Sequence, residues 1–68
     1  MNGGNSVPLN RRYGERTVLL TNPAGESLQG VQYVWFPVDE PPMIEVASVD
    51  RRWYRSVWID MGWDVRDV

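Results

Sequence analysis

The chain contains no cysteine and no histidine among its 68 residues, and all seven of its cationic residues are arginine. Without cysteine and histidine it cannot form a disulfide bond, a zinc finger, an iron–sulfur cluster or a histidine-ligated haem site. The same absence removes the nucleophiles and general bases that many enzymes use. Because only carboxylates and arginines remain for such chemistry, we predict that the protein is not an enzyme and has no catalytic residues.

Several ligand-binding and targeting signals are also missing. The sequence has no glycine-rich phosphate loop with its lysine, and no loop carries the alternating Asp and Asn ligands of an EF-hand. Its polar start lacks the apolar core of a signal peptide, and no apolar run reaches the ~20 residues of a membrane helix. We therefore expect a cytoplasmic protein that binds no cofactor, no metal and no membrane.

The length of the chain restricts it to one small domain with little interior. Residues 1–12 are expected to form a flexible tail, because asparagine, glycine and serine dominate its start, and residues 13–68 a single β domain. No disulfide can strengthen this domain, so its stability must come from apolar packing or from assembly. The four tryptophans suit this need, since each ring can bury ~150–250 Å².

Short segments with a two-residue period alternate with turn signals through most of the chain. Asn22-Pro23-Ala24-Gly25 has the residue preferences of a type I turn, and Pro41-Pro42 excludes a helix or a central strand. We predict four strands and a short fifth one, over residues 16–21, 30–37, 43–49, 53–59 and 63–68. Both faces of the second strand are apolar, which indicates a central position. The pattern favours an all-β fold, a four- or five-stranded antiparallel barrel or meander that is SH3-like or OB-like.

One stretch of the chain also permits a helix. Residues 43–61 contain neither glycine nor proline, and helical spacing would align Val49, Trp53 and Val57 on one stripe. Because β-branched and aromatic residues fill this stretch, strands are the first interpretation and a helix over residues 49–60 is the alternative. The strand pattern predicts a core made of Val18, Leu20, Val34, Phe36, Ile44, Val46, Val57 and Ile59.

Arginine and aromatic residues gather in residues 51–58. A guanidinium stacks on an aromatic ring and still keeps its hydrogen-bond donors for a partner, and Arg and Trp are frequent hot-spot residues of interfaces. The simpler alternative is that Trp53 packs in the core while the arginines around it are solvated. The binding hypothesis predicts a partner surface made of Arg51, Arg52, Trp53, Tyr54, Arg55 and Trp35.

The acidic residues form two groups, one around Asp39, Glu40 and Glu45 and one near the C-terminus. Their spacing selects no catalytic carboxylate pair, so we interpret them as solvated groups that maintain solubility. Mimicry of nucleic-acid charge is a further alternative, but the net charge of −2 is small for that role.

These features together predict a small non-catalytic protein-binding module whose partner is a host protein or a second copy in an oligomer. Compact stand-alone modules are typical of phages and other mobile elements, where they modulate a larger host protein. The alternative is a nucleic-acid-binding β-barrel that uses the Arg/aromatic ridge, assisted by Tyr33 or Trp35. The negative net charge favours a protein partner, because nucleic-acid-binding domains are usually basic.

Overall fold

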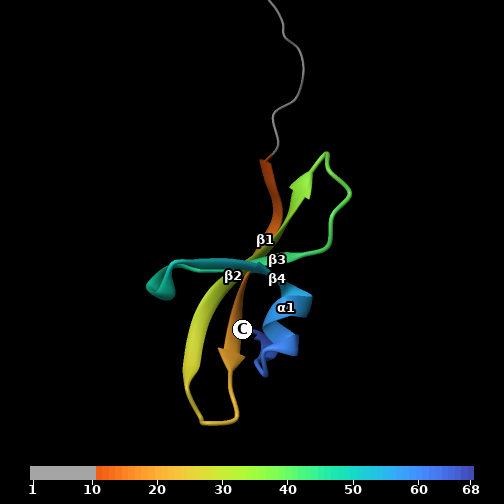
Figure 1. Ribbon diagram of the computed structural model, residues 1–68. Helices are drawn as coiled ribbons and strands as arrows, with labels where there is room; N and C mark the ends of the chain where they lie inside the picture. Colours follow the sequence, from red (N-terminus) through yellow and green to blue (C-terminus); the bar gives the residue numbers. More distant parts are fainter. Residues whose placement is uncertain (1–10) are drawn as a thin grey trace, which may run out of the picture.

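The computed structural model describes residues 11–68, which form a five-stranded antiparallel sheet with one short helix (Figure 1). The strands lie in the order β4-β3-β2-β1-β5, so the first four form a meander and β5 returns to pair with β1. The sheet is not closed into a barrel, so of the two predicted arrangements the structure has the meander. The strands are β1 (Arg11–Thr21), β2 (Ser27–Phe36), β3 (Met43–Val46), β4 (Arg51–Tyr54) and β5 (Asp64–Asp67).

The turn between β1 and β2 lies where the sequence predicts it. The backbone N–H of Gly25 donates to the carbonyl of Asn22 at 3.0 Å, and the Asn22 side chain accepts from the backbone N–H of Glu26 at 2.9 Å. Gly25 has a positive φ of 88°, as is usual for the residue after a type I turn in a hairpin. Asn22 and Gly25 therefore fix the register that continues into both strands.

β1 begins earlier than predicted, at Arg11. A register shift between Tyr13 and Arg16 interrupts the alternation, and Gly14 adopts a positive φ of 63° there. This bulge hides the first half of the strand from a search for two-residue periodicity. Of the expected tail, residues 1–10 lie outside the described part of the chain, and the last two residues already belong to β1.

β2 is the central strand, as its two apolar faces predict. Its Gly30 allows close approach of β3, because a β-carbon at this position would lie 2.9 Å from the carbonyl oxygen of Glu45. The β1–β2 hairpin is longer than β3, which pairs only with residues 31–33 of β2. The end of the hairpin away from its turn, where Arg11 pairs with Phe36, therefore extends beyond the other three strands (Figure 1).

The third and fourth predicted strands are each too long. β3 ends at Val46 and is followed by a 3₁₀ turn, η2 (Ala47–Val49), and by Asp50 with a positive φ of 52°. β4 ends at Tyr54, and the helix α1 (Arg55–Asp60) follows at once. The predicted strand over residues 53–59 is therefore wrong after its second residue, and the helical alternative is confirmed for the second half of its range.

A Schellman motif ends α1. Gly62 has a positive φ of 99° and donates its N–H to the carbonyl of Ile59, while the N–H of Trp63 donates to the carbonyl of Trp58, both at 3.0 Å. The same motif commonly includes an apolar contact across the helix end, and here the Trp58 and Trp63 rings meet edge to face. Gly62 therefore marks the end of a helix, whereas the sequence alone indicated only a break between strands.

The core lies between α1 and one face of the sheet. Val18, Leu20, Ile44 and Val46 are buried as predicted, and Trp58 of α1 joins them. The other half of the predicted core is not fully buried: Val34 is half-buried, and Phe36, Val57 and Ile59 are 51%, 38% and 48% exposed.

Two physical reasons account for these errors. Phe36 lies at the end of β2, where β1 is its only neighbouring strand. Val57 and Ile59 belong to a helical turn, so they do not share one face with the side chains of β4. Instead, the turn directs Trp58 into the core.

No helix within residues 11–68 is long and apolar enough to cross a membrane.

Candidate partner-binding surface

The predicted site residues are divided between the two faces of the sheet. Ile44 pairs with Trp53 on the face that α1 covers, whereas Met43 pairs with Tyr54 on the opposite face. Because side chains alternate along β4, Arg51 lies on the covered face and Arg52 on the opposite one. The structure therefore does not bring the predicted residues together into one ridge.

Trp53 belongs to a row of three tryptophans that attaches α1 to the sheet. Its ring centroid lies 4.5 Å from that of Trp58, which in turn lies 5.9 Å from that of Trp63. The indole N–H of Trp58 donates to the carbonyl of Ile44 at 3.1 Å, so this fully buried ring has its polar atom satisfied. These contacts agree with the simpler alternative for Trp53, in which its ring packs against the core.

The side chain of Arg55 also has a structural contact. Its Nη1 donates to Oε1 of Gln32 at 3.1 Å, and Gln32 is only 6% exposed. The backbone N–H of Arg55 donates to the carbonyl of Pro42 at 2.9 Å, which ties the start of α1 to the segment before β3. Arg55 therefore satisfies a buried amide and is less available to a partner than its neighbours are.

The open face, defined as the sheet face opposite α1, holds the other predicted residues: Trp35, Arg52 and Tyr54. Trp35 makes an edge-to-face contact with Tyr33, at 5.3 Å between centroids. Met43 of β3 pairs with both Tyr33 and Tyr54, so it joins the aromatic residues of β2 and β4. The open face is therefore rich in apolar side chains, although α1 does not cover it.

Arg12 also lies on the open face, although it is not among the residues predicted from the sequence. Its guanidinium lies 4.3 Å from the centroid of the Tyr33 ring and pairs with the carboxylates of Glu45 and Glu15. Desolvation lowers the pKa of Arg12, but its hydrogen bond to Glu45 and the nearby negative charges outweigh this effect and raise the pKa overall. The expected tail included Arg12, so these contacts were not predicted. No local sequence signal pairs Arg12 with Glu45, which lies 33 positions away.

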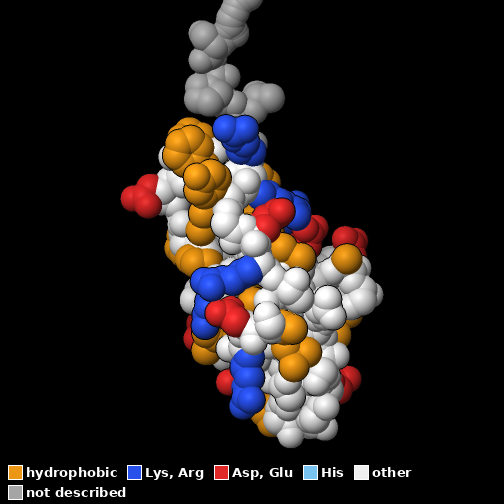
Figure 2. Space-filling view, turned by 180° about the vertical axis from the view of Figure 1, so that it is seen from behind, with side chains coloured by type: hydrophobic (Ala, Val, Ile, Leu, Met, Phe, Trp, Pro, Cys, Tyr) orange, Lys and Arg blue, Asp and Glu red, His pale blue; other side chains and the backbone are white. Residues whose placement is uncertain are grey.

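Three of the seven arginines form ion pairs with carboxylates. In addition to Arg12, Arg16 pairs with Asp67 at 3.2 Å and Arg66 pairs with Asp64 at 2.8 Å. Figure 2 shows the result on one side of the molecule, where blue and red side chains alternate and no continuous basic stripe forms. Arg51 and Arg52 make no ion pair with any residue of the described chain.

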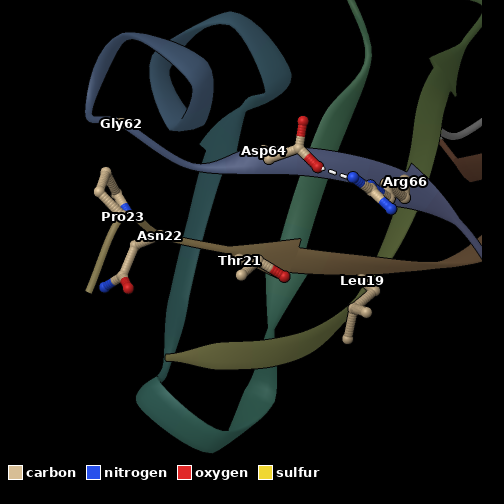
Figure 3. A pocket seen from close by; sticks show the side chains of 7 residues that line it. All are labelled: Leu19, Thr21, Asn22, Pro23, Gly62, Asp64 and Arg66. Atoms are coloured by element: carbon tan, nitrogen blue, oxygen red, sulfur yellow. Dashed lines mark hydrogen bonds and ion pairs between the residues drawn. The ribbon is translucent and has the colours of Figure 1, made fainter. Parts of the chain in front are cut away.

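The surface of the molecule has two shallow hollows. The first has a volume of about 430 Å³ and lies where β1 ends beside the start of β5 (Figure 3). Leu19, Pro23 and Gly62 contribute to its wall, and the Asp64 and Arg66 side chains pair with each other along β5 on one side of it. Since its charges neutralise each other, this hollow is a poor candidate for binding a charged ligand.

The second hollow, of about 440 Å³, is named here the Trp63 hollow. Its lining comes from the end of the β1–β2 turn, from the start of β2, from η2, from the start of β4 and from the residue that precedes β5. It includes Arg51, which is one of the predicted site residues. The lining residues are Glu26, Ser27, Leu28, Val49, Arg51 and Trp63.

Among residues 11–68 no cluster of three or more Asp and Glu side chains is arranged to hold a metal ion. No family model, no curated protein and no solved structure matches this chain. The SH3-like and OB-like parts of the fold prediction therefore stay predictions.

Proposed function

We propose that this protein is a small non-catalytic protein-binding module that uses the open face of its sheet. The observation that carries the proposal is that this face has no covering layer within the described residues, yet bears large apolar side chains. Trp35, Met43 and Tyr54 are all only half-buried there. Exposed apolar surface that is rimmed by polar groups usually marks an interface with another protein.

The polar groups of the open face suit a protein partner. Arg52 is exposed on the same face as Tyr54, and its fork of donors can bind a carboxylate or a backbone carbonyl. The Arg12–Glu45 pair crosses this face over the Tyr33 ring, and both of its charges already have partners. A centre of aromatic and Met side chains with a polar rim is the usual composition of protein interfaces.

Nucleic-acid binding is the second candidate, since Trp35 and Tyr54 offer rings on which bases can stack. Affinity for phosphates depends on cations that are available to them. On the open face, Arg12 and Arg66 are engaged by carboxylates, which leaves Arg52 without an ion pair among residues 11–68. Together with the net charge of −2, this favours a protein.

The partner is a host protein or a second copy of the chain, and a module of this size suits a phage or mobile element that modulates a host protein.

Capture from a lysate of the source organism, followed by titration calorimetry with the purified partner, tests the proposal. Tyr54→Ala and Arg52→Glu are expected to weaken binding, and a hot-spot aromatic costs about 2 kcal/mol, roughly thirtyfold in affinity. Sedimentation replaces calorimetry if the partner is a second copy.

Arg11→Glu is the matched control, because it makes the same charge change at the exposed start of β1. Melting curves must show that each variant stays folded. Unchanged affinity in both folded open-face variants would reject the proposal. A steep loss of affinity between about 50 and 200 mM salt would instead identify nucleic acid as the ligand.

A further inference from the structure

The Trp63 hollow combines an apolar floor with charged groups of opposite sign. Leu28 and Trp63 are half-buried and pack against the core, and Val49 adds apolar surface at 40% exposure. Arg51 and Glu26 supply the charges. A hollow of about 440 Å³ is at the small end of the ~300–1,000 Å³ of typical ligand pockets, so it fits one or two side chains of a peptide.

The cation of this hollow is positioned but not neutralised. The guanidinium of Arg51 lies 5.0 Å from the centroid of the Trp53 ring, a distance at which cation and ring attract each other. Arg51 forms no ion pair with a residue of the described chain. A guanidinium held in one place with unused donors is suited to bind a carboxylate through two parallel hydrogen bonds.

The anion of the hollow is held in the β1–β2 turn. Oε1 of Glu26 accepts from the side-chain amide of Asn22 at 2.7 Å, and the backbone N–H of Glu26 donates to the side-chain oxygen of Asn22 at 2.9 Å. A fixed carboxylate beside a single cation repels phosphate groups. It therefore disfavours nucleic acid here and favours a ligand with both a negative group and hydrogen-bond donors.

From these contacts we infer that the Trp63 hollow binds an extended peptide segment of a partner protein, in which an apolar side chain stands next to an Asp or Glu. The apolar side chain packs on Leu28, Val49 and Trp63. The carboxylate of the peptide binds Arg51, and a backbone N–H or a basic side chain faces Glu26. Since Arg51 lies on the covered face, this site is separate from the open face and does not depend on the function proposed for it.

A random heptapeptide display library, selected on the purified wild-type chain, tests the inference. Selected peptides are expected to contain Leu, Phe or Trp beside Asp or Glu. For one such synthetic peptide, replacing its acidic residue by the amide should weaken binding about tenfold, in the range of a charge-assisted hydrogen bond. Arg51→Gln should cause a similar loss, and combining both changes should add little, because they remove the same interaction.

Arg52→Glu is the matched control for Arg51→Glu, since the two residues are neighbours on opposite faces of β4. We expect Arg51→Glu to abolish peptide binding and Arg52→Glu to preserve it, with melting temperatures measured for both. Selection of no acidic–apolar motif, or undiminished binding by folded Arg51→Glu, would overturn the inference. If only Arg52→Glu loses peptide binding, the peptide binds the open face and not the hollow. If the wild-type chain self-associates and Arg51→Glu abolishes this, the occupant of the hollow is a second copy of the chain.

Discussion

Tyr33 combines deep burial with an unused polar atom. Its side chain is 1% exposed, and its hydroxyl has no hydrogen-bond partner in the structure. A buried hydroxyl that lacks a partner costs stability, whereas the ring contributes packing against Trp35 and Arg12. We therefore expect Tyr33→Phe to raise the free energy of unfolding by about 1 kcal/mol, measured by urea denaturation. Tyr54→Phe is the control, and a destabilised Tyr33→Phe protein would show that the hydroxyl is bonded in solution.

Arg55 is expected to matter for stability more than for partner binding. Replacing it by Ala leaves Oε1 of the buried Gln32 without its donor, which should cost about 1–3 kcal/mol. Arg52→Ala removes the same type of side chain from an exposed position and should cost less than about 0.5 kcal/mol. Thermal and urea unfolding of the two variants make the comparison. Equal stability of the two would mean that the Arg55–Gln32 bond contributes nothing in solution.

The helix α1 has only six residues, so its own hydrogen bonds cannot stabilise it in isolation. It persists because Trp58 is buried against the sheet and because Gly62 ends the helix in a left-handed conformation. The core contacts of Trp58 and the Schellman hydrogen bonds therefore depend on each other.

Gly62 tests this dependence directly. Gly62→Ala must adopt a positive φ that costs a non-glycine residue about 1–3 kcal/mol, although there is space for the added methyl group, whose nearest neighbour would be 3.8 Å away. Gly62→Asn should lose less, because Asn tolerates the left-handed region. Chemical denaturation followed by tryptophan fluorescence measures both. A loss in Gly62→Ala no larger than in Gly62→Asn would argue against the strained helix end.

Residues 11–68 are expected to unfold as one unit. Trp58 contacts β3 through Ile44, β4 through Trp53 and the entry to β5 through Trp63, so a single side chain connects both edges of the sheet. Urea transitions monitored by far-UV circular dichroism and by tryptophan fluorescence should therefore coincide. A fluorescence transition at lower urea would show that α1 and its tryptophans detach before the meander unfolds.

The positions of the arginines make it possible to distinguish binding at the two proposed sites from non-specific electrostatic attraction. Arg12, Arg16 and Arg66 each have carboxylate partners, whereas Arg51 and Arg52 lie next to each other in sequence but on opposite faces. A charge reversal at either residue changes the net charge by the same amount. A difference between Arg51→Glu and Arg52→Glu in any binding assay therefore reports on the face, and not on the overall charge.

The sequence by itself determined the parts of the fold that depend on neighbouring residues. The turn at Asn22-Pro23-Ala24-Gly25, the central position of β2 and the short β5 were all recognisable, because turn preferences and apolar alternation act locally. The burial of Val18 and Leu20 on β1, and of Ile44 and Val46 on β3, followed from the same alternation.

Only the tertiary structure decided what residues 53–60 form and which side chains of the candidate site share a face. Both a strand and a helix bury some of the aromatic residues of this segment, so local periodicity cannot choose between them. The choice depends on contacts that Trp58 makes with Ile44 and Trp63, and on the amide of Gln32 that Arg55 satisfies. The contacts with Ile44 and Gln32 join residues that are far apart in the sequence, and this is why the sequence showed the Arg/aromatic cluster but not its division between two faces.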